Sequence, residues 1–183
     1  QSEKMKQNFK ENLAVYHLKN NAVIAIPTDT IYGFSCLPNI NAIKKIINLK
    51  KRDLNKGFIL LASDINYVLP YIDKSFAKKL ANAYKTKSSK PTTFLVPKNV
   101  NINSLITGDS KFIAIRITQN VLIKFLCEKT NSALISTSAN LQGKNTVKSL
   151  LELKKQAKNY LSFALSPENN NNNPSTIINL LSG

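Results

Sequence analysis

The chain of 183 residues has few of the residue types that serve as catalytic bases, metal ligands or covalent cross-links, with two cysteines and one histidine. Cys36 and Cys127 lie far apart and have no cysteine or histidine at ligand spacing, so neither a disulfide framework nor a zinc site is expected. This cysteine usage predicts an intracellular, reducing location, and we expect the cytoplasm. A Ser-His-Asp or Cys-His mechanism would have to use His17, which we interpret as a helix-face residue without a catalytic role.

Glycine and long apolar runs are also scarce. The five glycines form neither a P-loop nor a Gly-x-Gly-x-x-Gly fingerprint, which excludes P-loop ATPases and Rossmann dehydrogenases. No apolar run approaches the length of a membrane span, and residues 1–4 lack the apolar region of a signal peptide. We therefore expect no membrane partner.

Arginine is scarce as well, because only Arg52 and Arg116 among the 26 lysine and arginine residues are arginines. Both lie beside apolar segments rather than in the lysine-rich stretches. Arginine presents a planar fork that fixes the orientation of a phosphate or carboxylate, whereas lysine supplies a flexible point charge. The two residues are therefore candidates for anion recognition, with structural ion pairs as the alternative.

What the chain has in excess is positive charge, with a formal net charge of +16. Such an excess suggests contact with polyanions or nucleotides. Lysine and asparagine are both abundant, so a compositional bias without function is the alternative explanation.

Apolar periodicity divides the chain into alternating helices and strands. Residues 2–19 are expected to form a helix whose buried face carries Met5, Phe9, Leu13 and Tyr16. Asn41 is expected to cap the next helix, which runs into residues 50–52. Further helices are expected at residues 74–84, 120–130 and 147–158, and strands at residues 22–26, 58–62, 92–96, 112–117, 133–136, 161–165 and 176–180. This pattern predicts one α/β domain over residues 1–183, with helices packed on a twisted mixed sheet.

Three loops follow apolar elements and carry hydroxyl or basic groups: residues 27–33, 50–56 and 136–143. Ligands of open α/β sheets bind beyond strand ends, so these loops could converge on one pocket. Lys50, Arg52 and Lys56 form the strongest cluster and would suit a nucleotide triphosphate. Compensation of the helix macrodipole is the alternative for the bases, and simple capped turns are the alternative for the hydroxyls.

Five motifs follow one another along the chain: residues 26–33 (Ile-Pro-Thr-Asp-Thr-Ile-Tyr-Gly), 49–52 (Leu-Lys-Lys-Arg) with Lys56 and Gly57, 114–117 (Ala-Ile-Arg-Ile), 136–140 (Ser-Thr-Ser-Ala-Asn) with Gly143, and 173–177 (Asn-Pro-Ser-Thr-Ile). In this order they closely resemble the YrdC/TsaC family, specifically its short single-domain members. The resemblance covers nearly the whole chain. Residues 88–91 (Ser-Ser-Lys-Pro) depart from it, because the family commonly has Pro-Gly-Pro there.

The resemblance implies a twisted mixed parallel and antiparallel sheet with helices around a basic concave face. It also implies an L-threonylcarbamoyladenylate synthase, a nucleotidyltransferase that makes threonylcarbamoyl-AMP and pyrophosphate from L-threonine, bicarbonate or carbon dioxide, and ATP. Partner proteins then transfer the group to tRNAs that read codons beginning with A. Magnesium would enter with ATP, held mainly by the phosphates and not by the protein.

The resemblance further assigns roles to residues that match its motifs. Lys50 and Arg52 would be catalytic and, with Lys56, would bind the triphosphate. Ser138, Asn140 and Thr93 would contact the nucleotide. Thr28, Thr30 and Arg116 would bind threonine or the carbamate, and Ser136, Ser175 and Thr176 would lie on the rim.

Two other functions remain compatible with the sequence. A noncatalytic protein could use the basic face to bind tRNA or double-stranded RNA, since lysine-rich surfaces bind phosphate backbones without sequence preference. Such a protein would not need hydroxyl-rich loops and two arginines near strand ends. A carbamoyltransfer domain is the third possibility, although such domains usually belong to larger proteins.

Overall fold

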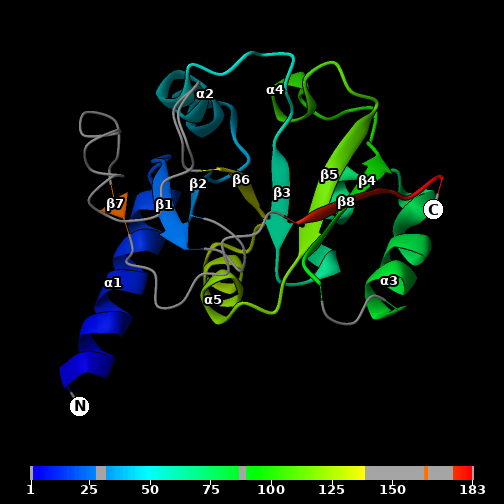
Figure 1. The fold of residues 1–183 in the computed structure, drawn as a ribbon. Helices are drawn as coiled ribbons and strands as arrows, with labels where there is room; N and C mark the ends of the chain where they lie inside the picture. The colour runs from blue at the N-terminus through cyan, green and yellow to red at the C-terminus, as the bar shows by residue number, and fades with distance from the viewer. Residues whose placement is uncertain (1, 28–31, 87–89, 139–162, 165–174, 183) are drawn as a thin grey trace.

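The computed structural model describes residues 2–27, 32–86, 90–138, 163–164 and 175–182, and the fold in these ranges is built on one eight-stranded sheet (Figure 1). The strand order is β7-β1-β2-β6-β3-β5-β4-β8. The strands are β1 (Ile24–Pro27), β2 (Tyr32–Cys36), β3 (Ile59–Ala62), β4 (Thr92–Pro97), β5 (Phe112–Ile117), β6 (Leu134–Ser138), β7 (Phe163–Ala164) and β8 (Thr176–Asn179). The expected helix at residues 147–158 lies outside the described residues.

The sheet is mixed, as the sequence predicts. Strand β3 pairs in parallel with β5 and antiparallel with β6, so both directions meet at the centre of the sheet. The pairs β1–β7 and β4–β8 are also parallel, whereas β1–β2, β2–β6 and β4–β5 are antiparallel. The presence of both parallel and antiparallel strand pairs therefore confirms the α/β class with a mixed sheet. The basic concave face stays a prediction.

Helices flank this sheet. The helices are α1 (Ser2–Lys19), α2 (Ile40–Lys50), α3 (Ala77–Thr86), α4 (Ser104–Thr107) and α5 (Val121–Thr130), and the short 3₁₀ turns are η1 (Ile65–Tyr67), η2 (Leu69–Tyr71) and η3 (Lys74–Phe76). Figure 1 shows α2 and α4 beyond one end of the central strands and α5 toward the other end. Within the described residues, no helix combines the length and apolar character needed to cross a membrane.

The core is made of branched apolar side chains on adjacent strands and helices. Ile24 of β1, Leu60 of β3, Ile115 of β5 and Ile135 of β6 are all fully buried. β-branched side chains pack well on a pleated surface, which explains why these short apolar runs become strands.

The expectation for the buried face of the first helix was wrong. The helix has the predicted bounds, but Met5, Phe9 and Tyr16 are 70%, 69% and 61% exposed. The opposite face, with Ala14, Val15 and Leu18, is buried instead, and α1 packs on α5 and β1. Both apolar stripes satisfy the helical period, and the one that packs on the rest of the protein is the buried one.

Two local predictions also need correction. Asn39, not Asn41, caps α2, because the Asn39 side chain accepts a hydrogen bond from the Ala42 backbone N–H at 3.0 Å. The sequence interpretation also placed residues 27–33 in a loop and missed strand β2, which pairs with β1 and β6. Gly33 lies within β2, and a glycine inside a strand weakens the strand signal.

Candidate functional site

The candidate site begins where α2 ends. Lys51 adopts the left-handed conformation with φ 48° and donates its backbone N–H to Asn48 O, and the Arg52 N–H donates to Ile47 O at 3.1 Å. This pair of hydrogen bonds is the usual way to satisfy the last carbonyls of a helix and turn the chain. The turn keeps Lys50 and Arg52 on the side of strand β6 while leaving Lys51 exposed.

Lys50 is a buried cation held by the end of β6. Its ammonium donates to Ser138 O at 2.6 Å, to Thr137 Oγ1 at 3.2 Å and to Ser138 Oγ at 3.3 Å. Only 5% of the residue is exposed. Burial, and secondly the positive charge of Arg52, lowers the pKa of Lys50 to about 8. An anion placed here would stabilise the charged form of this lysine.

Arg52 is held by oxygen atoms of its own loop. Its Nη2 donates to Gly57 O at 2.6 Å and its Nε to Lys56 O at 3.3 Å, with a longer contact of 3.4 Å from Nη1 to Thr137 Oγ1. The guanidinium carbon lies 4.9 Å from the centre of the Phe58 ring, a cation–π distance. Burial lowers the pKa of Arg52. Among the residues described, these contacts are carbonyl and hydroxyl oxygens and not a carboxylate, which disfavours a structural ion pair.

The loop that holds Arg52 is clamped against a second loop. Residues Lys56 and Gly108 form an antiparallel bridge, and the Phe58 N–H donates to Ile106 O at 2.9 Å. A Cβ atom on Gly57 would lie 2.7 Å from Thr107 O, closer than real Cβ contacts allow. Only glycine permits this close approach of the two loops. The approach holds Gly57 O where it accepts a hydrogen bond from Arg52.

A second polar group lies further along the sheet. Arg116 pairs with Leu61 in the β3–β5 ladder and is 5% exposed. In the antiparallel β4–β5 ladder Phe94 pairs with Ile115, so the preceding residue, Thr93, lies across from Arg116. The hydroxyl oxygen of Thr93 is 2.7 Å from Ser175 Oγ. In the β3–β6 ladder, Ile59 pairs with Ser136 and Leu61 with Leu134. Arg116 therefore lies roughly 13 Å along the strand direction from the row of Ser138, at about 3.3 Å per residue.

The expected site residues thus divide into groups. The structure brings Lys50, Arg52 and Ser138 together, and Arg116, Thr93 and Ser175 form a separate group. Lys56 is exposed in the loop after α2, and its main-chain oxygen accepts from Arg52 Nε. The expectation that its ammonium binds the triphosphate stays a prediction.

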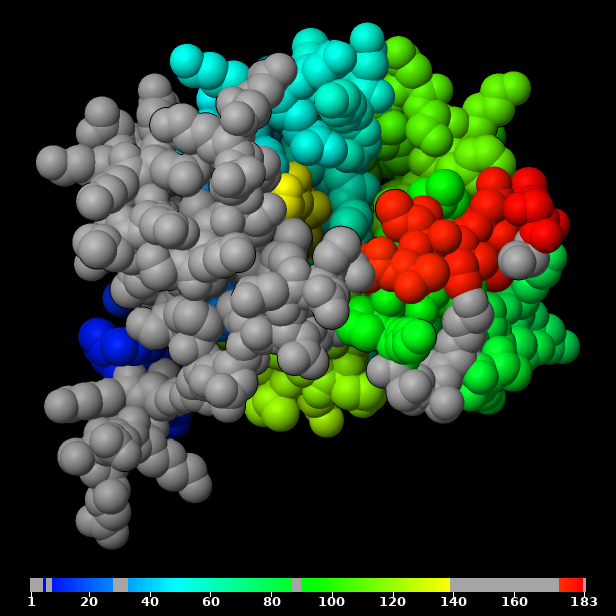
Figure 2. Space-filling view, in the orientation of Figure 1, coloured from blue at the N-terminus to red at the C-terminus, as the bar shows by residue number. Residues whose placement is uncertain are grey.

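The remaining expected residues have less direct positions. Ser136 is 8% exposed in β6, and Thr176 is exposed at the start of β8. The predictions for Thr28, Thr30 and Asn140 lie outside the described residues. Figure 2 shows atoms of the β6 region, in yellow, at the bottom of a hollow between the cyan segment and the red β8 segment.

Sequence reasoning missed three residues of this arrangement. Thr137 supplies the hydroxyl that Lys50 and Arg52 share, and Phe58 supplies the ring beneath Arg52. Ser35 pairs with Ser136 across β2 and β6 and is fully buried, and its Oγ has no hydrogen-bond partner among the described residues. Thr137 lies within the motif of residues 136–140, so its hydroxyl could have been predicted from the sequence. Nothing in the sequence singles out Phe58 or Ser35.

Neither cysteine nor any metal cluster contributes to the described part of this site. Cys36 and Cys127 are buried and free, and burial raises the pKa of Cys36 to about 12. Within the described ranges, no group of three or more His, Cys, Asp or Glu side chains could hold a metal ion. The described groups are cations and hydroxyls, which bind anions by charge and hydrogen bonding.

Comparison with known proteins gives one family. The family model Sua5_yciO_yrdC, described as "Telomere recombination", matches residues 17–183. The threonylcarbamoyl-AMP synthase of Buchnera aphidicola subsp. Baizongia pistaciae is 40% identical over 174 residues, covering 92% of this chain and 92% of that protein. The threonylcarbamoyl-AMP synthase of Actinobacillus succinogenes is 36% identical over 166 residues, covering 90% of this chain and 91% of that protein.

Solved structures show the same fold at lower identity. The P. abyssi Sua5 structure complexed with L-threonine has a TM-score of 0.85 at 21% identity and covers 94% of this chain. This chain spans about half of that one, because the match covers 51% of it. The E. coli YciO structure has a TM-score of 0.75 at 22% identity, covering 92% of this chain and 82% of that chain. At these identities the structures support the fold alone.

Proposed function

Because the chain belongs to the Sua5_yciO_yrdC family, we propose that it is a threonylcarbamoyl-AMP synthase, the name carried by relatives that match about nine-tenths of its length. It is an enzyme that transfers an adenylyl group. L-Threonine and bicarbonate form N-carboxythreonine and water, and a carboxylate oxygen of this carbamate then attacks the α-phosphorus of ATP. The bond from the α-phosphorus to the bridging oxygen breaks, and pyrophosphate leaves.

The observation that carries this proposal is the convergence of Lys50 and Arg52 on the hydroxyl of Thr137. The buried Lys50 and the partly buried Arg52 at one strand end form a preorganised site for a polyanion, and their charge is worth more there than at an exposed surface. As pyrophosphate departs, negative charge grows on the leaving oxygens. Lys50 and Arg52 would stabilise that charge, and Lys56 would reach the outer phosphates from the exposed loop.

This chemistry asks for positioning and charge rather than a protein nucleophile. In phosphoryl-type transfer the protein mainly aligns the reacting groups and stabilises charge. A chain whose only histidine, His17, belongs to α1 can therefore catalyse it. ATP would enter as its magnesium complex, with the ion held mainly by the phosphates.

The separation of the two polar groups suits an elongated substrate. With the triphosphate at Lys50 and Arg52, Arg116 would bind a carboxylate at the other end, supported by the hydroxyl pair of Thr93 and Ser175. In this proposal Ser138 and Asn140 contact the nucleotide, and Thr28 and Thr30 hold threonine or the carbamate. Thr93 would serve the threonine end and not the nucleotide, because it lies across from Arg116.

The burial of Lys50 argues against a noncatalytic RNA-binding protein. Lysines that bind a nucleic-acid backbone exchange counterions at an exposed surface, whereas Lys50 is 5% exposed and bonded to β6. The exposed lysines leave tRNA binding by a basic face as an additional role. In this proposal the whole chain forms one domain that acts in the cytoplasm, and downstream transfer proteins accept the product.

The direct test uses the purified protein with ATP, magnesium and bicarbonate. Pyrophosphate release is measured with L-threonine, without it, and with L-valine, which keeps the branched side chain but lacks the hydroxyl. The proposal expects release that depends on both L-threonine and bicarbonate. Release at the same rate without an amino acid would instead show a simple ATP pyrophosphatase and would contradict it.

A further inference from the structure

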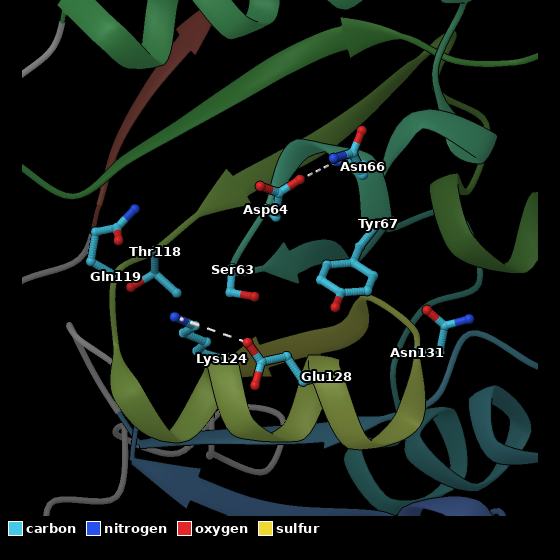
Figure 3. Close-up of a pocket in the computed structure, with 9 residues that line it drawn as sticks. All are labelled: Ser63, Asp64, Asn66, Tyr67, Thr118, Gln119, Lys124, Glu128 and Asn131. Carbon is cyan, nitrogen blue, oxygen red and sulfur yellow. Dashed lines mark hydrogen bonds and ion pairs between the residues drawn. The ribbon is translucent and has the colours of Figure 1, made fainter.

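A polar cavity lies at the opposite end of β3 from Arg52 (Figure 3). Strands β3 and β5 are parallel neighbours and end together at Ala62 and Ile117, and the Thr118 N–H donates to Ala62 O at 2.9 Å. The chain then diverges from the two strand ends, and a cavity of about 560 Å³ opens between Ser63, Thr118 and helix α5. Crevices beyond the carboxyl ends of parallel strands are common ligand sites in α/β sheets.

Polar side chains line this cavity, and two of them, the carboxylates of Asp64 and Glu128, can only accept hydrogen bonds. Figure 3 shows Asp64 and Tyr67 on one side and Glu128 of α5 on the other. Asp64 is held in place because one carboxylate oxygen accepts the Asn66 backbone N–H at 2.8 Å. The pKa of the Tyr67 hydroxyl is raised by burial and then by Cys127, Glu128 and Asp64, so both carboxylates act on the same space.

One resident cation shares this space. Lys124 Nζ lies 4.0 Å from Glu128 Oε1, at the outer limit of an ion pair, and the two side chains are 66% and 54% exposed. Exposed pairs of this kind contribute little and open easily. Lys124 balances one of the two carboxylates, so the lining keeps one negative charge although the chain carries +16. The cavity is therefore suited to a positively charged group.

We propose that this cavity binds an aliphatic ammonium or guanidinium group, placed between Asp64 and Glu128, with the Ser63 and Thr118 hydroxyls accepting further hydrogen bonds. Its volume lies within the range of small-molecule sites, roughly 300 to 1,000 Å³. The group could belong to a free amine or to a basic side chain of another protein. The inference does not depend on the proposed synthase activity, because it uses no residue of the Lys50 and Arg52 group.

The test titrates the full chain with 1,4-diaminobutane at low salt and follows backbone amide shifts by NMR. Shifts are expected at Ser63, Thr118 and α5. Asp64→Asn is expected to weaken binding by about threefold or more, since asparagine keeps the cap of η1 but removes the charge. Asp73→Asn is the matched control, because Asp73 caps η3 in the same way and does not line the cavity. It should leave the affinity unchanged.

A second pair of variants makes opposite predictions. Glu128→Gln should weaken diamine binding, whereas Lys124→Gln should strengthen it by removing the competing ammonium. Loss of affinity in Lys124→Gln, with tighter binding of glycine than of the diamine, would show a site for zwitterions and overturn the proposal. Equal losses in Asp64→Asn and Asp73→Asn would show only nonspecific charge attraction and would also overturn it.

Two further ligands identify the required chemistry and its source. 1,4-Butanediol keeps the shape of the diamine without its charge, and binding of the diol at equal affinity would overturn the proposal. Nα-acetyl-lysine N-methylamide represents a protein side chain. If it binds at least as tightly as the diamine, a partner protein is the source, and tighter binding of the diamine points to a free amine.

Discussion

The ammonium of Lys50 donates to the main-chain oxygen of Ser138 at 2.6 Å, which joins the last residue of α2 to the last residue of β6. This contact does not depend on a side-chain rotamer of Ser138. It places the ammonium beside Thr137 Oγ1, which also accepts from Arg52. The strand end therefore sets the position of both cations, and substitutions around it should affect anion binding in distinguishable ways.

Arg52→Lys should remove the planar fork while keeping the charge. The shorter reach of a single ammonium cannot replace the contacts to Gly57 O and Lys56 O and the stacking on Phe58. Each charge-assisted hydrogen bond is worth about 1.5 to 3 kcal/mol, so kcat/KM for threonine-dependent pyrophosphate release should fall by roughly tenfold to a hundredfold or more.

Lys51→Gln is the matched control for that variant. Lys51 is the neighbouring exposed lysine, and its substitution removes a charge from the same helix end. It should change kcat/KM by less than about threefold, as expected for an exposed charge. A similar loss in both variants would mean that general positive charge, and not the geometry of Arg52, matters.

The affinity for ATP should fall as the pH rises above about 8. The pKa of Lys50 in the free protein is lowered to about 8, mainly by burial. A bound phosphate raises that pKa, so above pH 8 binding must take up a proton, and the affinity should fall by up to about tenfold per pH unit. Below pH 8 the ammonium is already charged and the affinity should level off.

Calorimetry from pH 7 to 9.5 in buffers of different ionisation enthalpy would measure both the affinity and the proton uptake. In Lys50→Arg the cation stays charged over this range, so the pH dependence should disappear. A wild-type affinity that is flat to pH 9.5 would show that Lys50 does not face the phosphates.

Thr137→Val should weaken ATP binding and lower stability together. Valine keeps the branched shape in a position that is 8% exposed, but it removes the hydroxyl shared by Lys50 and Arg52. Leaving a buried charged donor with fewer acceptors costs about 1 to 3 kcal/mol. Denaturant unfolding should show this loss, whereas Thr86→Val on the exposed face of α3 should cost much less.

Gly57→Ala should disturb Arg52 without touching its side chain. The new Cβ would lie 2.7 Å from Thr107 O, so the loop must move and carry Gly57 O away from Arg52. We expect destabilisation of about 1 to 3 kcal/mol and a weaker affinity for ATP. An unchanged melting temperature with unchanged ATP affinity would show that the loop clamp has no role in the site.

The sequence located the main elements of the site but not their relative positions. The basic run after an amphipathic helix predicted Lys50 and Arg52, and the hydroxyl-rich segment predicted Ser138, because both signals are local. The distance of Arg116 from this pair depends on the β3–β5 and β3–β6 registers, which no local pattern encodes. Thr137 accepts from both Lys50 and Arg52, which lie 87 and 85 positions before it in the chain. A contact over that separation depends on the fold and not on a local pattern.

Errors in the fold have the same physical origin. The apolar stripe of α1 satisfies the helical period, yet Phe9 is exposed because the opposite face with Ala14 and Leu18 packs on the body of the protein. Period alone does not say which of two apolar faces is covered. Strand β2 was missed because Gly33 weakens the local strand signal, whereas pairing with β1 and β6 stabilises the segment.

The most direct measurement of the central claim identifies the nucleotide product by mass. The protein is incubated with ATP, magnesium, L-threonine and ¹³C-labelled bicarbonate, and the same reaction is run with Arg52→Lys. The account predicts an adenylate that contains one threonine and one labelled carbon, formed with pyrophosphate and strongly reduced in the variant. Formation of AMP or ADP alone, or a product without the labelled carbon, would contradict it.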